Sequence, residues 1–330
     1  MPQAHIIGTG SAVPERIITN KDIESFVDTD EKWIVRRTGI HERHIATKGK
    51  EESTSNLAAT ASMRAMEMAG VSPDEIDTII VATVSADRNF PSTACFVQEK
   101  ICARNAASFD VGAACAGFLY ALATGYNAIK GGMSKTSLVI GAERLSSIIN
   151  WQDRTTCVIM ADGAGAAVLS AQQDSDSGIQ SMYLKSDGTL WELLYTTRGN
   201  RYIPEILSGM ELSESYMKMN GNRLFKKAIE SMSISAKKAF EATGLSGKDI
   251  SLVIPHQANI RIIHALAKDL NIPVEKIYTN IHKYGNTSSA SIPIAMDEAN
   301  REGRLKKGDN VLLVAFGAGL TWGSSIVKWS

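Results

Sequence analysis

An internal repeat with a constant spacing of 174 residues runs through the 330-residue chain. The stretch EMAGVSPDEIDTIIVATVSA resembles EATGLSGKDISLVIPHQAN when Gly70 is aligned with Gly244. The same shift aligns LVIGAE with LLVAFG, and the helical pattern after Cys115 with the one that begins at Ala290. Because one ungapped shift relates three separate elements, the sequence predicts a duplicated fold made of two similar halves.

Apolar runs rich in β-branched residues alternate with helical patterns in both halves, which is typical of a layered α/β fold. The expected strands are residues 78–85, 137–143, 166–171, 251–256 and 310–317. The expected helices are residues 55–69, 116–130, 221–243, 259–270 and 290–302. A polar stretch, QQDSDSG, predicts the junction between the halves, so that the first comprises residues 1–174 and the second residues 175–330.

Charge and cysteine content exclude several classes of function. Acidic and basic residues balance at 35 each, so no overall field favours nucleic acid or an anionic membrane as a partner. We expect a cytoplasmic protein, because the sequence has neither a membrane-spanning run nor a basic, secretory-type N-terminal segment. The four cysteines are expected to be reduced, and the absence of a Cys-x-x-Cys pair argues against a structural metal site.

The segment DVGAACAGFLYAL places Cys115 between a strand-like run and an apolar helix. Apolar side chains cover nearly every face of AGFLYALATGYNAIK, which predicts a helix buried on all sides. The positive end of a helix dipole lowers the pKa of a nearby thiol, so Cys115 is a candidate nucleophile. The alternative is that Cys115 is a small core residue, because free cysteine is among the most buried residue types. The stretch alone leaves both interpretations open.

His256 and Asn286 also stand at predicted junctions between a strand and a helix. In layered α/β proteins, active sites lie at the carboxyl ends of strands, where loops lead into helices. We therefore expect the two side chains to converge with Cys115, although 141 and then 30 positions separate the three residues.

At these residues the chain resembles the β-ketoacyl-acyl-carrier-protein synthase III enzymes of the thiolase-like condensing superfamily. The resemblance extends over essentially the whole chain, through GTGSAVPERIITNKDI, DEKWIVRRTGIHERH, FPSTAC, DVGAACAGFLYAL, DRTTCVIMADGAGAAVL, PHQANIRII, GNTSSASIPIAMDEA and FGAGLTWGS. It implies a duplicated thiolase-like fold, in which two similar α/β halves form αβαβα layers.

The resemblance also implies an activity, which is the decarboxylative Claisen condensation of an acyl-CoA starter with malonyl-acyl-carrier protein. An acyl-cysteine would be the intermediate, and the reaction would initiate fatty-acid synthesis without a cofactor or metal. The runner-up is a starter or acyl-transfer condensing enzyme of polyketide- or quinolone-type secondary metabolism. A hypothesis of another class is a non-catalytic scaffold that binds carrier protein, but three polar residues at strand-to-helix junctions argue against it.

By resemblance, Cys115 is the nucleophile, His256 and Asn286 complete the catalytic triad, and the backbone N–H groups of Cys115 and Ala318 form an oxyanion hole. Coenzyme A would be held by Trp33, Arg37, Arg154, Asn259 and Arg261. Phe90 resembles the residue that closes the partner's acyl pocket in a homodimer. A basic patch for the acidic carrier protein would comprise Lys226, Arg261 and Lys268, and its alternative is an ordinary solvated face.

Overall fold

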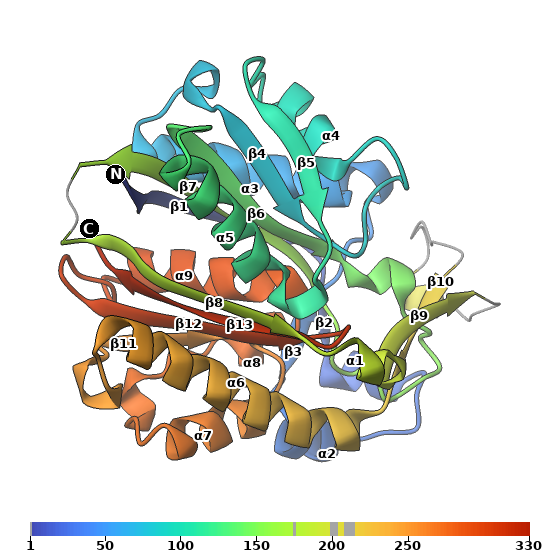
Figure 1. Ribbon diagram of the computed structural model, residues 1–330. Coiled ribbons are helices and arrows are strands. Elements are labelled where there is room, and N and C mark those ends of the chain that lie inside the picture. The colour runs from blue at the N-terminus through green and yellow to red at the C-terminus, as the bar shows by residue number, and fades with distance from the viewer. Residues whose placement is uncertain (1, 174–175, 199–203, 208–214) are drawn as a thin grey trace.

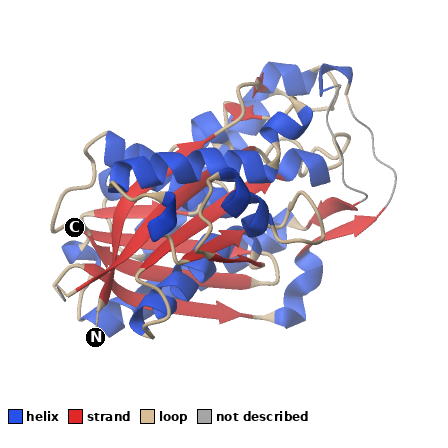
Figure 2. Cartoon of the chain, turned by 90° about the horizontal axis from the view of Figure 1, so that it is seen from above, coloured by secondary structure: helices blue, strands red, loops and turns tan. Residues whose placement is uncertain are grey.

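Two β-sheets lie face to face in the computed structural model, which describes residues 2–173, 176–198, 204–207 and 215–330. Helices α5 and α9 lie between the sheets and contact strands of both (Figure 1). α3 and α4 cover the outer face of the first sheet, and α6 and α7 cover that of the second (Figures 1 and 2). These helices are α3 (Thr54–Ala69), α4 (Thr93–Lys100), α5 (Gly117–Lys130), α6 (Gly221–Thr243), α7 (Ile260–Asp269) and α9 (Ser291–Arg301). The five layers confirm the predicted αβαβα class.

Four strands follow the same order in the two sheets, and among the described residues β5 of the first sheet has no equivalent in the second. The first runs β1-β7-β6-β4-β5 and the second runs β8-β13-β12-β11. Their strands are β1 (Gln3–Ala12), β4 (Thr78–Ala82), β5 (Ala107–Val111), β6 (Thr136–Arg144), β7 (Asp162–Gln172), β8 (Gly178–Ser186), β11 (Leu252–Pro255), β12 (Asn310–Gly317) and β13 (Thr321–Lys328). In each sheet a parallel pair is extended by antiparallel strands, so the same pattern of pairing occurs twice.

Strand register repeats at the spacing seen in the sequence. Thr78 lies opposite Ser137 in the β4–β6 pair, and Leu252 lies opposite Val311 in the β11–β12 pair, 174 residues further along. α3 and α6 both end at a glycine in the left-handed region, the conformation that glycine adopts most readily. The predicted division between residues 174 and 175 falls outside the described residues and stays a prediction.

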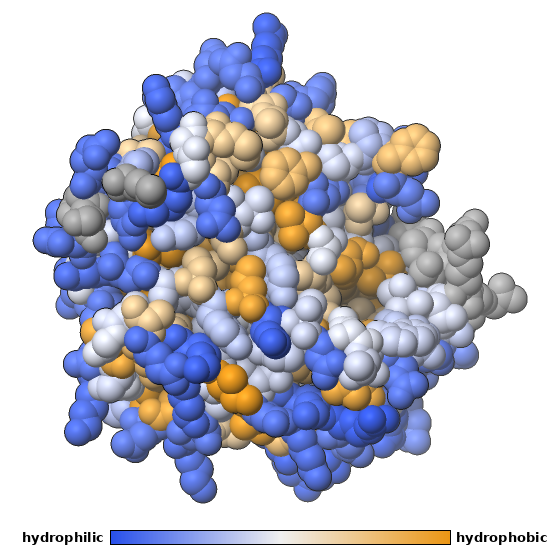
Figure 3. All heavy atoms as spheres, viewed as in Figure 1, coloured by the Kyte–Doolittle hydropathy of each residue, from blue (hydrophilic) through white to orange (hydrophobic). Residues whose placement is uncertain are grey.

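Smaller elements surround one end of this framework. They are β2 (Ile17–Thr19), α1 (Asn20–Glu24), α2 (Glu31–Thr38), β3 (Glu42–His44), α8 (Ile281–Tyr284), β9 (Leu194–Arg198) and β10 (Ser215–Met219). β9 and β10 form a hairpin at the side where Figure 3 shows apolar surface beside the uncertain residues. Among the described residues, no helix is both long and apolar enough to cross a bilayer.

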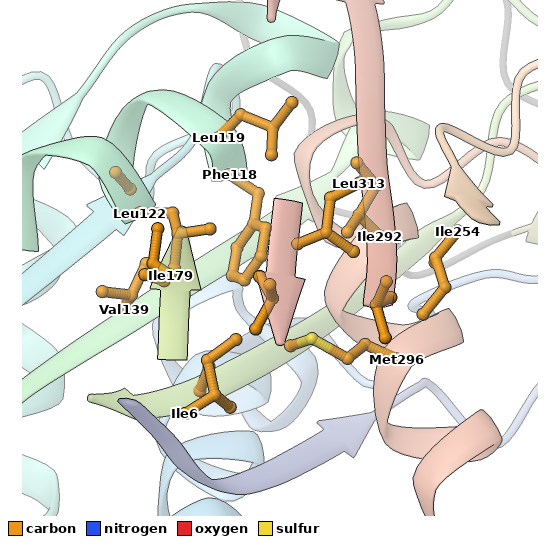
Figure 4. Packing of buried hydrophobic residues seen from close by; sticks show 14 of the residues in the cluster. Ile6, Phe118, Leu119, Leu122, Val139, Ile179, Ile254, Ile292, Met296 and Leu313 are labelled. Carbon is orange, nitrogen blue, oxygen red and sulfur yellow. The ribbon is translucent and has the colours of Figure 1, made fainter. Parts of the chain in front are cut away.

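Burial of α5 fixes the centre of the molecule. Phe118, Leu119 and Leu122 point into a cluster that also contains Ile292 of α9 and Leu313 of β12 (Figure 4). Each fully buried side chain of this size contributes roughly 1.5–3 kcal/mol of hydrophobic stabilisation. Both sheets bury the helix, and of the residues just before it Ala116 is buried while Ala114 and Cys115 are partly buried.

Candidate active site

Cys115 lies in a short 3-10 turn, Ala114–Ala116, between β5 and α5. The backbone at Ala114 is left-handed, with a φ of 46°, and the corresponding turn Ser288–Ala290 begins with a φ of 50° at Ser288. Gly317, at the end of β12, packs against the first turn. A Cβ at that glycine would stand 2.7 Å from the Cys115 backbone nitrogen, so a larger residue would displace the turn.

A cavity of about 280 Å³ opens beside Cys115, and His256 and Asn286 line it as well. Ala318 and Asn259 are also in its wall. The other lining side chains are mostly apolar, among them Leu145, Ile148, Met160, Leu194, Met217, Met219, Leu224 and Met232. Three residues far apart in the sequence thus face one largely apolar cavity.

His256 follows β11 and is almost fully buried. Its Nδ1 lies 2.6 Å from Ser291 Oγ, which also accepts a hydrogen bond from the Gln257 backbone N–H at 3.4 Å. The Ser291 hydroxyl proton can therefore point to Nδ1, which leaves the ring hydrogen on Nε2. Burial lowers the pKa of His256 to about 3, so the imidazole is neutral at physiological pH.

Asn286 is held at both its backbone and its side chain. Its N–H donates to Ile159 O at 3.0 Å, and its carbonyl oxygen accepts from the Ala161 N–H at 2.9 Å. Its side-chain Oδ1 accepts from the backbone N–H of Ser288 at 2.8 Å. Because the amide oxygen is occupied in this way, the Nδ2 hydrogens are the groups left to donate into the cavity.

The Cys115 thiol does not have the low pKa that its helix position predicted. Its pKa is raised to about 12, mainly by burial; the Ser288 hydroxyl opposes the rise and the nearby Glu143 carboxyl adds to it. The thiol is only partly accessible, from the cavity side. Loss of water around a charged sulfur outweighs the helix dipole here, so the resting residue is a neutral thiol.

Glu143, at the end of β6, is a fully buried carboxyl in the same region. It accepts hydrogen bonds from Ser85 Oγ at 2.5 Å, from Ser289 Oγ at 2.9 Å and from the Val84 N–H at 3.1 Å. Burial raises its pKa to about 7, and these donors oppose the rise. Near neutral pH the group therefore exists in both protonation states.

The predicted coenzyme A residues gather at one edge of the cavity. The Arg154 and Arg37 guanidinium carbons lie 4.8 and 5.8 Å from the centre of the Trp33 ring. Asn259, which lines the cavity, donates a side-chain hydrogen bond to the Arg37 carbonyl at 2.8 Å. Arg261 lies 5.1 Å above the ring of Phe225, another lining residue.

Of the predicted binding residues, only Asn259 lines the cavity; Phe90, Lys226 and Lys268 also lie outside its wall. Phe90 is 85% exposed. Lys226 on α6 and Lys268 on α7 are exposed, and the two helices pack against each other. The opposite face of α7 is buried in the core of the second half, through Ile263 and Leu266.

Sequence reasoning missed Glu143, Ser288 and Ser291, which contact or adjoin the predicted catalytic residues. A carboxylate at the end of an otherwise apolar strand was an available signal for Glu143. The serines of GNTSSASIP offered no comparable signal, because their importance depends on which strand ends lie opposite. Among the described residues, no cluster of three or more metal-ligating side chains is present.

Comparisons with known proteins agree with this architecture. The family model for 3-oxoacyl-[acyl-carrier-protein (ACP)] synthase III matches residues 109–188, and the family model for the C-terminal part of these enzymes matches residues 240–329. The chain is 50% identical over 327 residues to the β-ketoacyl-[acyl-carrier-protein] synthase III of Caldanaerobacter subterraneus, covering 99% of this chain and 98% of the relative.

Two solved structures have the same fold with a TM-score of 0.90. The 3-oxoacyl-[acyl-carrier-protein] synthase III of Aquifex aeolicus is 46% identical, and the match extends over 99% of this chain and 100% of that protein. A priming β-ketosynthase from a polyketide biosynthetic pathway is 33% identical, and the match extends over 100% of this chain and 98% of that protein. The duplicated, layered fold is therefore that of the thiolase-like condensing enzymes. Within that class, the chain belongs to the 3-oxoacyl-[acyl-carrier-protein] synthase III family.

Proposed function

We propose that the protein condenses an acyl-CoA starter with malonyl-acyl-carrier protein through an acyl group on Cys115, and so initiates fatty-acid synthesis. The observation that carries the proposal is the meeting of Cys115, His256 and Asn286 at one apolar cavity. Relatives named for this activity are more similar to the chain than the polyketide-pathway neighbour, with 50% against 33% identity. The runner-up function is therefore not favoured.

In the first half-reaction, the Cys115 sulfur attacks the thioester carbonyl and coenzyme A leaves. The backbone N–H groups of Cys115 and Ala318 would stabilise the tetrahedral oxyanion, and a donor of this kind accounts for roughly 10²–10³ in rate. The closeness of Gly317 to the Cys115 nitrogen and the position of residue 318 in the cavity wall support this role. An apolar cavity also protects the resulting thioester from water.

In the second half-reaction, malonyl thioester loses carbon dioxide and leaves an enolate. The enolate carbon attacks the acyl group, and the bond between the acyl carbon and the Cys115 sulfur breaks. His256 Nε2 and Asn286 Nδ2 would donate hydrogen bonds to the enolate oxygen. A histidine that is neutral and carries its proton on Nε2 suits this task, and so does an asparagine whose oxygen is already bonded. Neither residue has to act as a charged group.

Coenzyme A would enter along Trp33, Arg37, Arg154, Asn259 and Arg261. Stacking and cation–π contact suit an adenine ring, and guanidinium groups suit its phosphates. The cluster of Trp33 with the two arginines, joined to the cavity by Asn259, supports this route.

Carrier protein would dock beside the same entrance, on Lys226, Arg261 and Lys268. The contact of Arg261 with the cavity residue Phe225 supports this location. We also propose a homodimer in which Phe90 closes the partner's acyl pocket, and the large exposure of this aromatic side chain supports that arrangement. The cytoplasmic location is likewise a proposal.

Acylation of the protein by a panel of acyl-CoAs tests the proposed function. Intact mass should show one added acyl group, and peptide mapping should find it on Cys115. Cys115→Ala should abolish the modification. His256→Ala and Asn286→Ala should become acylated but fail to condense with malonyl-acyl-carrier protein. A wild-type protein that takes no acyl group from any donor would refute the proposal, and the preferred donor identifies the starter.

A further inference from the structure

The buried carboxyl of Glu143 is hydrogen-bonded unevenly at its two oxygens. Oε2 accepts from three groups of the loop after β4, which are Ser85 Oγ at 2.5 Å, the Val84 N–H at 3.1 Å and Thr83 Oγ1 at 3.3 Å. Among the described residues, Oε1 has a single hydrogen-bond partner, Ser289 Oγ, at 2.9 Å. Three hydrogens thus point at one oxygen, while the other depends on one hydroxyl of the turn before α9.

The Ser289 hydroxyl has two neighbours that need a hydrogen and only one hydrogen to give. Its oxygen lies 2.9 Å from Glu143 Oε1 and 2.9 Å from the Ala82 carbonyl oxygen. A carbonyl oxygen cannot donate, so an ionised Glu143 leaves one of these two contacts without a hydrogen. A proton on Oε1 removes the shortage, because Oε1–H donates to Ser289 Oγ and the Ser289 hydrogen then serves Ala82. Every contact of this group has its own hydrogen only when Glu143 is neutral.

The surroundings of Glu143 also favour its neutral form. The residue is fully buried, and burial raises its pKa to about 7. Its titratable neighbour is the Cys115 thiol in the turn before α5. No titratable side chain is buried on α3 or α5, and Asp297 of α9 bonds instead to hydroxyls of β1. On β7, Gly163 lies opposite Glu143 and has no side chain, while Arg144 points to the other face of β6. Among the described residues, Glu143 forms no ion pair that would favour its charged form.

The Ser289 contact reaches the active site through the turn that contains it. One residue earlier, the Ser288 N–H donates to Asn286 Oδ1 at 2.8 Å, which leaves the Nδ2 hydrogens to donate into the cavity. Gly141, two residues before Glu143 on β6, packs against the same turn, because an added Cβ would stand 2.2 Å from the Ser289 carbonyl oxygen. A fixed Ser289 therefore fixes the donor that orients Asn286.

We propose that Glu143 is a positioning residue that acts as a neutral carboxylic acid, its Oε1–H donating to Ser289 Oγ so that the turn before α9 keeps Asn286 in place. The inference rests on the proposed function, which gives Asn286 its part in the second half-reaction. When rising pH removes the Glu143 proton, Ser289 has two acceptors again and the turn loses one of its two hydrogen bonds. Condensation then slows, whereas acylation of Cys115 does not depend on this contact.

Glu143→Gln distinguishes a neutral acid from a carboxylate. The glutamine amide donates from Nε2 to Ser289 Oγ and accepts the hydrogen bonds of the loop after β4 at its oxygen, so it reproduces the neutral acid at every pH. Ser289→Ala removes the contact altogether. Asp297→Asn is the matched control, because Asp297 is also a buried carboxyl, accepts from Ser11 Oγ at 2.6 Å and lies outside the cavity wall.

Single-turnover condensation measures the effect, with protein acylated beforehand by long incubation with acetyl-CoA and then mixed with malonyl-acyl-carrier protein at pH 6 or 8.5. We expect the wild-type and Asp297→Asn rates to fall about tenfold between these values, because a group with a pKa of about 7 becomes mostly ionised. The Glu143→Gln rate should stay within about twofold of the wild-type rate at pH 6 and should not fall at pH 8.5. Ser289→Ala should condense about tenfold more slowly at both. Rapid mixing with acetyl-CoA should show acylation within about threefold of wild type in all variants.

Infrared difference spectra between the two pH values detect the proton itself. The wild type should show the C=O band of a protonated carboxylic acid at pH 6 and lose it at pH 8.5. Subtracting the spectrum of Glu143→Gln isolates the contribution of this residue. Absence of the Glu143 band at pH 6 would overturn the inference.

The kinetic outcomes have separate meanings. A normally folded Glu143→Gln that condenses at least tenfold more slowly at pH 6 shows that the site needs a carboxylate, and overturns the inference. A parallel fall with pH in wild type and Glu143→Gln assigns the dependence to another group and also overturns it. Equal losses in acylation and condensation, with a lower unfolding midpoint, show a merely structural role. A wild-type protein that takes no acyl group refutes the proposed function and with it the role in condensation, while the infrared band still decides whether Glu143 is protonated.

Discussion

Burial determines which side chains near the cavity carry charge. It keeps the His256 imidazole and the Cys115 thiol neutral and holds the Glu143 carboxyl near its titration point. In each case burial disfavours the charged form, because little water surrounds the group. The chemistry proposed for the cavity therefore depends on hydrogen-bond donors, with charge developing only during the reaction.

Ser291 orients His256, and its removal should impair the second half-reaction. Ser291→Ala eliminates the hydroxyl 2.6 Å from Nδ1, so the ring loses its fixed tautomer. We expect condensation to slow about tenfold while acylation of Cys115 stays near the wild-type rate. Single-turnover assays of the two half-reactions measure this split, and a uniform loss of both rates would contradict it.

Glu143 should make stability depend on pH in a defined direction. Its folded-state pKa of about 7 lies above the ordinary value of 4.5, so its contribution is fully present below pH 4.5 and is lost as the pH rises through 7. Between pH 5 and 8, we expect the wild type to lose about 2–3 kcal/mol of unfolding free energy relative to Glu143→Gln. Urea unfolding of both proteins at the two pH values measures this. A difference between them that stays constant with pH would count against the assignment.

The sequence predicted the environment of single side chains less well than it predicted helices and strands. The cysteine, histidine and asparagine were predicted to converge, because each was expected at a junction between a strand and a helix. Cys115 and His256 do follow strands, whereas Asn286 follows the short helix α8. The raised pKa of Cys115 was not predicted, since a helix terminus is visible in a sequence and the loss of surrounding water is not. Ser291 contacts His256, which follows a strand earlier in the chain, and a local pattern contains no information about such a neighbour.

Strand ends and turns position these groups, and close backbone contacts hold them there. Gly141 of β6 passes the turn that contains Ser289, where an added Cβ would stand 2.2 Å from the Ser289 carbonyl oxygen. Gly112 lies in open space, with no atom within 4 Å of an added Cβ. The same substitution to alanine would therefore meet close backbone atoms at Gly141 and none at Gly112.

Gly141→Ala should destabilise the protein by roughly 1–3 kcal/mol, since overpacking forces the backbone to move. Gly112→Ala should change the unfolding free energy by less than about 0.5 kcal/mol. Urea unfolding compares the two variants with wild type. Equal effects would mean that the turn before α9 is free to shift without cost.

All five expected helices and all five expected strands are present, because the apolar patterns that predicted them are local. The expected helix at 116–130 is Gly117–Lys130, and the expected strand at 310–317 is Asn310–Gly317. β1, β5, β8 and β13 were not among the expected strands of the two large sheets. The first three lie at the edge of a sheet, whereas β13 lies between β12 and β8. Edge strands are recognised by their pairing partners more than by their own composition.

On the scale of the whole molecule, assembly is the main prediction. β5 is an edge strand of the first sheet. The side chain of Phe90 projects into solvent, with 85% of its surface exposed. Phe90→Asp should shift a homodimer toward monomer, because a charge would have to be buried in the interface. Met133→Asp is the control, as this methionine is also exposed, at 68%. Analytical ultracentrifugation at micromolar concentration distinguishes the species. A dimer that persists in Phe90→Asp and dissociates in Met133→Asp would place the contact elsewhere.

The paired turns before α5 and α9 have one further consequence. Ser289 occupies in the second half the position that Cys115 occupies in the first, and both follow a residue with a left-handed backbone. The two halves thus contain equivalent positions at the start of an interior helix. The first half has a thiol there, on Cys115, and the second has a hydroxyl, on Ser289. In the second half this position carries the Ser289 hydroxyl, which forms a hydrogen bond with the buried Glu143 carboxyl, so the two equivalent positions make different contacts.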